Sequence, residues 1–188
     1  PAPKITVPGE ELAAVIVQEA GIASAWKAML SGDALQKRVE TFQALAAVQT
    51  AASPNFFAAD GSAAGLYGMT QAQLQEGLDS GKISFANGAT ELLQAIRNHP
   101  ATANAVAVAY WVMLDSQAFP DSPAHQLRFN ASKEAWCVIG MARGVAEMRA
   151  RITASDAEDP TSDPLLQKMQ PWYTSLGVYH QSHPVATP

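Results

Sequence analysis

The part of the chain most able to take part in chemistry is the segment 53–71, which directly follows the helical stretch ending in Gln49-Thr50. This segment holds proline, asparagine, aspartate and three glycines, and it lies between two alanine-rich stretches. Such residues form turns, and glycine lets a backbone approach a ligand closely. The composition therefore predicts a long structured loop at the end of a helix, where binding residues are often found.

The other side chains that could act in catalysis or bind a metal do not form a recognisable site. Asp60 precedes Gly61, and Asp-Gly is first of all a turn signal. His180 and His183 supply only two nitrogen ligands, whereas zinc sites use three or four protein ligands. Cys137 is the single cysteine and lies in an apolar helical run, so we expect it to be a small core residue. We predict no metal site and no cofactor.

The order of residues around this loop resembles that of soluble lytic transglycosylases, which are enzymes of the lysozyme superfamily. In that family a catalytic Glu-Ser pair ends a helix, a loop of the type N-P-x-A-x-S follows, and a G-A-x-G-L-M-Q segment comes next. Here Gln49-Thr50 takes the place of Glu-Ser, and Ala64-Gly65-Leu66-Tyr67 takes the place of the G-L-M segment. Further along, Ala109-Tyr110-Trp111 resembles the family's A-Y-N segment. The resemblance covers residues 35–112.

The resemblance implies an all-α, lysozyme-like single domain, which can include a short β-hairpin. It also implies a muramidase-type lytic transglycosylase, which cleaves the β-1,4 bond of the peptidoglycan glycan strand without a cofactor. Gln49 would hold the catalytic position. The substrate-binding residues would be Thr50, Gly65, Leu66, Tyr67, Met69 and Tyr110.

The residue at the catalytic position departs from the family pattern. Lysozyme-type cleavage needs a carboxylic acid whose pKa is raised by a partly apolar pocket, so that it can protonate the glycosidic oxygen. An amide cannot donate that proton, and Gln49 therefore predicts an inactive chain. Three explanations of Gln49 are open. It is glutamine introduced in place of glutamate, the natural residue of a family member that kept the fold for glycan binding, or an ordinary helix-end residue whose match to the family is chance. The alternative function is a non-enzymatic helical structural or interaction protein, such as a component of a virion or secretion system, or an effector.

Hydrophobic periodicity predicts helices that would position these residues. Leu35, Val39, Phe42, Ala46 and Gln49 form one stripe, which places Gln49 on the buried face of its helix. Thr70 is a good N-cap for the next helix. Lys82–Phe85 could pair briefly as a strand. The expected helices cover 10–30, 35–49 with Asp33 as a possible cap, 71–78, 89–98, 101–114 and 132–152, and 101–114 is apolar on every side and should be central.

The chain is predicted to divide into a helical domain, 1–154, and an acidic hinge with an aromatic tail, 155–188. The tail is expected to dock on the domain or on a protein partner. Arg143, Glu147 and Arg151 predict a solvated stripe of ion pairs, and Glu40 is expected on the exposed side of its helix.

Charge and hydropathy narrow the choice of partners and compartments. A formal net charge of −5 argues against nucleic acid, because phosphate binding requires a basic surface. No apolar run is long enough to span a bilayer. The resemblance implies a periplasmic or secreted location if a signal peptide is removed, or a virion-associated one.

Overall fold

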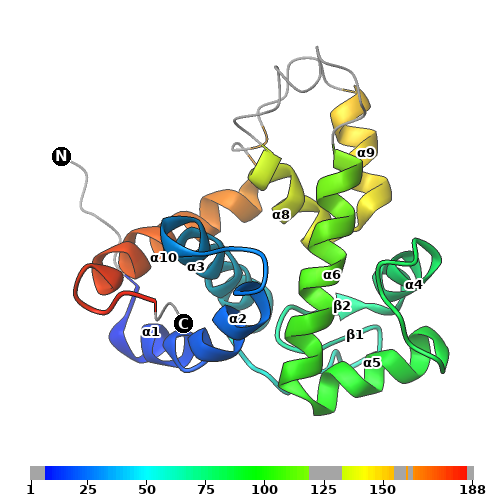
Figure 1. The fold of residues 1–188 in the computed structure, drawn as a ribbon, viewed down its shortest axis with the longest axis horizontal. Coiled ribbons are helices and arrows are strands. Elements are labelled where there is room, and N and C mark those ends of the chain that lie inside the picture. Colours follow the sequence, from blue (N-terminus) through cyan, green and yellow to red (C-terminus); the bar gives the residue numbers. More distant parts are fainter. Residues whose placement is uncertain (1–6, 119–132, 155–159, 161–162, 186–188) are drawn as a thin grey trace.

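The computed structural model describes residues 7–118, 133–154, 160 and 163–185. The chain is mainly helical with one short β-hairpin, as predicted (Figure 1). The elements are α1 (Gly9–Ile16), α2 (Glu19–Trp26), α3 (Gly32–Thr50), β1 (Ala63–Ala64), β2 (Met69–Thr70), α4 (Gln71–Asp79), α5 (Gly88–Asn98), α6 (Pro100–Ala118), α8 (Lys133–Arg143), α9 (Val145–Ala154) and α10 (Pro164–Ser182).

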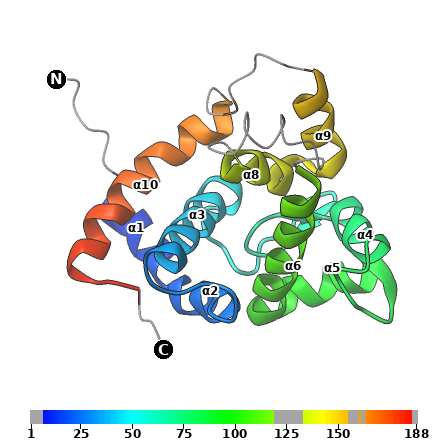
Figure 2. The same cartoon turned by 45° about the horizontal axis from the view of Figure 1, so that its top comes forward.

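The helices form two groups that share one hydrophobic core. In Figure 1, α1, α2, α3 and α10 lie together on the left, and α4, α5, α6 and the hairpin lie on the right. Helix α2 contacts both α3 and α6 and so joins the two groups. Helices α8 and α9 contact α6 at its C-terminal end, and α10 runs beside α3 in both Figure 1 and Figure 2. Helix α6 is deeply buried, which confirms the prediction for 101–114.

An aromatic cluster lies where α2, α3, α6 and the loop after α3 meet. The ring of Phe42 lies 5.2 Å from that of Trp26, 5.2 Å from Tyr67 and 5.3 Å from Trp111. The Arg38 guanidinium stacks over both Trp26 and Trp111, at 4.5 and 4.6 Å from the ring centroids. Aromatic and cation–π contacts of this kind stabilise the packing of these elements beyond the burial of their apolar surface.

Two predicted helices are each divided in two. The stretch 10–30 breaks between α1 and α2 at residues 17–18, and 132–152 breaks between α8 and α9 at Gly144. Gly144 has φ +92°, which a continuous α-helix excludes. The predicted pairing at Lys82–Phe85 is wrong, since this stretch forms no strand. The hairpin instead pairs Ala63 with Thr70 and Ala64 with Met69.

The start of α4 confirms the capping prediction at Thr70. The Thr70 hydroxyl accepts a hydrogen bond from the Gln73 backbone N–H at 3.2 Å. The Gln73 side-chain oxygen in turn accepts one from the Thr70 backbone N–H at 2.9 Å. This reciprocal capping box satisfies two donors that a helix start leaves unpaired.

The described part of 155–188 is helical and packs on the body of the protein. Helix α10 contacts α3 and also touches α8. Its N-cap residue, Asp163, is buried and lies 2.8 Å from Arg143 and 2.6 Å from Arg151. The predicted ion pairs are present, since Glu147 lies 3.7 Å from Arg143 and 3.1 Å from Arg151, and the same two arginines also hold the start of α10. Residues 155–159 and 161–162 of the predicted hinge lie outside the described residues.

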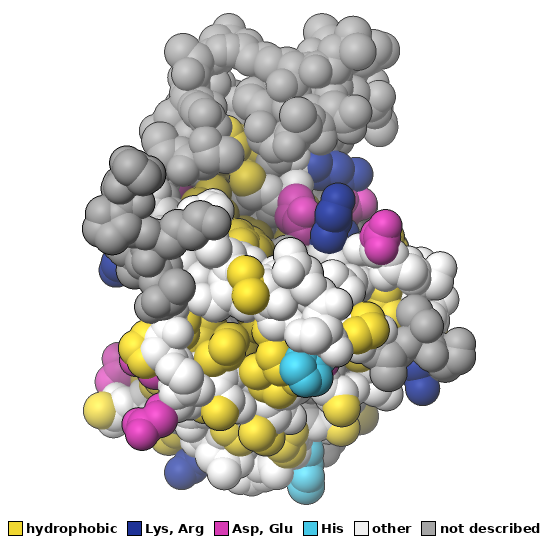
Figure 3. Space-filling model, turned by 90° about the vertical axis from the view of Figure 1, so that its left-hand side faces the viewer, with side chains coloured by type: hydrophobic (Ala, Val, Ile, Leu, Met, Phe, Trp, Pro, Cys, Tyr) yellow, Lys and Arg dark blue, Asp and Glu magenta, His cyan; other side chains and the backbone are white. Residues whose placement is uncertain are grey.

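Some hydrophobic side chains remain on the surface. Figure 3 shows them scattered over the side of the molecule that lies at the left in Figure 1. Val178 on α10 is 61% exposed, and Val17, between α1 and α2, is 76% exposed. Within the described ranges, every helix is too short or too polar to cross a membrane. A protein partner for the aromatic tail stays a prediction.

The C-terminal end of α3 supports a stability prediction. Ala51 has φ +53°, a left-handed conformation that costs an alanine about 1–2 kcal/mol. Because its side chain is exposed, Ala51→Gly should stabilise the fold by about 0.5–1 kcal/mol in urea unfolding. Ala47→Gly, one turn earlier in regular helix, should instead destabilise it by about 1 kcal/mol. Equal effects of the two variants would contradict the assigned backbone conformation.

Candidate functional site

The candidate site begins where α3 ends. Ala51 and Ala52 are both left-handed, with φ +53° and +57°, and the Ala52 N–H donates to the Ala46 carbonyl at 3.0 Å. Two successive alanines in this conformation are strained, and strained backbone is frequent at binding and catalytic sites. The turn directs the chain away from the helix axis into the loop 53–70.

Thr50 fastens that loop back onto the end of α3. Its buried hydroxyl lies 2.5 Å from the Leu66 carbonyl and 3.1 Å from the Ala46 carbonyl. The hydroxyl has one proton to donate, and the shorter contact with Leu66 is the stronger. This bond spans 16 residues of sequence and sets the position of the loop relative to Gln49.

Gly68 lies close to both the Thr50 methyl group and the Phe56 ring. A methyl group at Gly68 would lie 3.4 Å from the Thr50 Cγ2 atom and 3.7 Å from the Phe56 ring. Gly68 has φ +61°, which favours glycine over any other residue. Both Phe56 and Gly68 are half-buried and so present part of their surface to solvent. The family pattern has glutamine where Gly68 stands.

Gln49 is half-buried, not on the buried face of α3 as the periodicity predicted. The fully buried amide of this helix is that of Gln43. No residue that the structure describes makes a hydrogen bond to the Gln49 side chain. Its amide is therefore free to bind a ligand, next to the Thr50 anchor.

Gly65 is placed for packing against the neighbouring helices. It has φ +77°, and a methyl group there would lie 3.3 Å from the Ile96 carbonyl and 3.5 Å from the Ala103 Cβ atom. The close approach that this glycine allows is therefore to α5 and α6. A contact between Gly65 and a sugar stays a prediction.

The other predicted substrate-binding residues are buried in the core: Leu66, Tyr67, Met69 and Tyr110 each have an exposed fraction of 2% or less. The Tyr67 hydroxyl donates to Asn104 Oδ1 at 2.6 Å, and burial raises the pKa of Tyr67. Leu66, Tyr67 and Met69 therefore anchor the loop 53–70 in the core, and Tyr110 belongs to the buried part of α6. Direct contact with substrate stays a prediction for all four.

Tyr110 joins three elements through a carboxylate. Its hydroxyl donates to Glu76 Oε2 at 2.6 Å, and the same oxygen accepts the Val145 backbone N–H at 3.4 Å. Burial, together with the hydrogen bond and charge of Glu76, raises the pKa of Tyr110 above its ordinary value. Glu76 therefore connects α4, α6 and the start of α9.

A buried charge cluster was missed by sequence reasoning. His180 on α10 lies between Glu19 on α2 and Glu40 on α3, with Nε2 bonded to Glu19 Oε1 and Nδ1 3.1 Å from Glu40 Oε1. Burial lowers the pKa of His180, but the hydrogen bonds and negative charges of the two glutamates outweigh it and raise the pKa to about 9. Glu40, predicted to be exposed, is covered because α10 packs over it.

Asp60 serves the loop and not a catalytic centre. Its side chain is exposed and accepts hydrogen bonds from the Ser62 hydroxyl at 2.5 Å and the Ser62 N–H at 3.0 Å. These bonds lower the pKa of Asp60, so it stays ionised at neutral pH. The contact is a local turn, as the Asp-Gly signal predicted.

The residues at the end of α3 can form hydrogen bonds with a ligand, but they cannot protonate a glycosidic oxygen. The Gln49 amide offers hydrogen-bond donors and an acceptor, and the half-buried Phe56 offers an aromatic surface, but neither side chain has a proton acidic enough for general acid catalysis. Comparisons of the chain with protein-family models, curated proteins and solved structures found no match.

The anchoring role of Thr50 can be tested by removing its hydroxyl. Thr50→Val leaves the Leu66 carbonyl without this donor and should lower the free energy of unfolding by about 1–3 kcal/mol. Thr50→Ser keeps the hydroxyl and loses one methyl group, so it should cost about 0.8 kcal/mol or less. Denaturant unfolding measures both. A smaller loss for Val than for Ser would exclude the anchor.

Proposed function

We propose that this chain is a lysozyme-like domain that binds the peptidoglycan glycan strand at the end of α3 and, with Gln49 in place, does not cleave it. The observation that supports the proposal most is the short bond from Thr50 to the Leu66 carbonyl, at 2.5 Å. It holds a glycine-rich loop against a helix end, beside an amide without a described partner.

The chemistry of the site is consistent with binding without turnover. Glycan strands present hydroxyl and acetamido groups, which hydrogen-bond to amides, and sugar rings have apolar faces that pack on aromatic side chains. Gln49 and Phe56 offer these two kinds of contact on adjacent segments. A carboxylic acid at position 49 would be needed to protonate the leaving oxygen.

Binding is tested by sedimentation with purified peptidoglycan. The chain should pellet with the polymer, and Phe56→Ala should weaken association by about tenfold or more, since aromatic contacts dominate such surfaces. Met29→Ala, which removes a side chain that is 57% exposed on another part of the surface, is the matched control and should change nothing. Melting curves confirm that both variants are folded. No association of the unmodified chain would contradict the proposal.

A non-enzymatic interaction protein is the second candidate. It is favoured by the burial of Leu66, Tyr67, Met69 and Tyr110, which leaves few predicted substrate contacts accessible. The exposed Val178 on α10 offers a place for a protein partner. Failure of peptidoglycan sedimentation would favour this candidate.

A further inference from the structure

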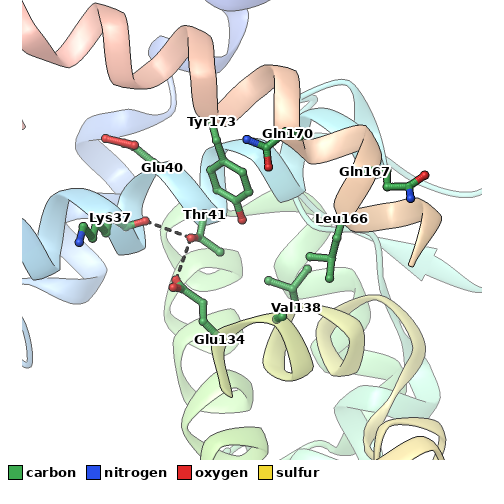
Figure 4. Close-up of a pocket in the computed structure, with 10 residues that line it drawn as sticks. Lys37, Glu40, Thr41, Glu134, Val138, Leu166, Gln167, Gln170 and Tyr173 are labelled. Atoms are coloured by element: carbon green, nitrogen blue, oxygen red, sulfur yellow. Dashed lines mark hydrogen bonds between the residues drawn. The ribbon is translucent and has the colours of Figure 1, made fainter. Parts of the chain in front are cut away.

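A concave feature lies away from the end of α3. A cavity of about 440 Å³ is bounded by α3, α8 and α10 (Figure 4). This volume falls within the range of sites that hold small organic ligands. Thr41 on α3 lines it, eight residues before Gln49, and eight residues correspond to about 12 Å along a helix. The cavity is thus separate from the candidate site.

One wall of the cavity is polar. The Thr41 hydroxyl lies 2.8 Å from Glu134 Oε1 and 3.0 Å from the Lys37 carbonyl. Figure 4 shows Tyr173 and Glu134 reaching toward Thr41 from α10 and α8, with Gln170 beside Tyr173. Burial raises the pKa of Tyr173 to about 12, so its hydroxyl is a hydrogen-bond donor throughout the neutral range.

The opposite wall is apolar. Ala135 and Val138 on α8 and Leu166 on α10 line it. In Figure 4, Val138 and Leu166 lie next to each other, across from Thr41. A ligand that fits both walls has hydrogen-bonding groups on one side and a non-polar face on the other.

The two carboxylates at the cavity have cationic partners within the protein, and the ammonium group of Lys37, which also lines the cavity, points away from Thr41 in Figure 4. Glu134 lies 3.7 Å from the Arg38 guanidinium, and Glu40 is bonded to His180. Neither carboxylate therefore needs a cationic ligand. The ligand that fits best is neutral, hydroxylated and partly apolar.

Helix α10, which closes the cavity, is held at both ends. Asp163 at its start is bound by Arg143 and Arg151, and His180 near its end is bound by Glu19 and Glu40. Gln170 and Tyr173 lie between these two anchors. The cavity is therefore preformed, which lowers the entropic cost of binding.

We propose that this cavity binds a neutral saccharide unit, with its hydroxyl groups toward Thr41, Glu134 and Tyr173 and its apolar face toward Val138 and Leu166. The site goes beyond the proposed function because it uses none of the residues at the end of α3. It would give the chain a second point of contact with a carbohydrate.

Titration of the folded chain with di-N-acetylchitobiose, followed by calorimetry and by the NMR signals of Tyr173, tests the proposal. Ala135→Phe fills the cavity and should abolish binding. Ala146→Phe adds the same ring at an exposed position of α9 and should leave the affinity unchanged. Tyr173→Phe removes one donor and should weaken binding by about fivefold, consistent with one neutral hydrogen bond.

The results separate this site from the end of α3. Retained affinity in a folded Ala135→Phe protein would overturn the proposal, as would no binding of di-N-acetylchitobiose, maltose or a peptidoglycan disaccharide to the unmodified chain. Ala135→Phe should still sediment with peptidoglycan. If the unmodified chain binds the disaccharide in the cavity but does not sediment, the saccharide site stands and the proposed function fails.

Discussion

Gln49→Glu is expected to give this chain the ability to lyse peptidoglycan. The substitution keeps the shape of the side chain and supplies the missing proton donor at the end of α3. General acid catalysis contributes roughly 10²–10⁴-fold to a rate, so lysis of turbid cell-wall suspensions should rise at least about 100-fold above that of the unmodified chain. A Gln49→Glu protein that binds peptidoglycan but remains inactive would contradict the family mechanism.

The matched control for this variant is Gln94→Glu, which makes the same change of charge at an exposed position of α5. It should have no lytic activity. The new carboxyl at position 49 would be half-buried, and partial burial raises the pKa of a carboxyl group. Activity should therefore persist toward neutral pH and fall as the pH rises above that raised pKa. Gln49→Asp, whose carboxyl is one methylene shorter, should recover less activity.

The largest expected loss of stability follows from His180→Ala. This change removes the imidazole that lies between Glu19 and Glu40 and leaves two poorly exposed carboxylates without their cation. Breaking a buried ion pair from one side costs about 3–5 kcal/mol. The melting temperature should fall by roughly 6–20 °C. His99→Ala, at an exposed position, should change it little, and adding Glu19→Gln to His180→Ala should restore part of the loss.

The same cluster predicts a dependence of stability on pH. The pKa of His180 is raised from 6.5 to about 9 in the folded protein, so the folded state holds the proton more tightly than the unfolded state. The stabilisation is complete below about pH 6.5 and is lost as the pH rises through about 9. The unmodified protein should therefore lose stability between pH 7 and pH 10 in urea unfolding. His180→Ala should give a flatter profile, and parallel profiles would show that His180 is not charged in the fold.

Features encoded by short stretches of sequence could be predicted, whereas those set by tertiary contacts could not. The start of α4 depends on Thr70 and Gln73 alone, and it was predictable from these residues. The break between α1 and α2 has neither glycine nor proline at residues 17–18, so no local signal marked it. Glu40 lies 140 residues from His180, and only the packing of α10 on α3 shows that it is covered.

The candidate site likewise has features that could be predicted from short stretches of sequence and features that depend on tertiary contacts. The loop and the end of α3 were predicted from turn residues and from the order of Gln49-Thr50. The burial of Tyr67 depends on Phe42 and Asn104, which come from α3 and α6, so the sequence pattern alone did not separate a core tyrosine from a cleft tyrosine. The path of the loop back to α3 likewise depends on a tertiary contact, the bond from Thr50 to the Leu66 carbonyl.

The central claim is that the end of α3 binds a glycan strand. Titration of the isotope-labelled chain with soluble peptidoglycan glycan fragments, followed by two-dimensional NMR, tests it most directly. We expect concentration-dependent shifts of the Gln49 side-chain amide and of the backbone amides of Phe56 and Gly68. Saturating fragment with no change at these three residues would contradict the claim.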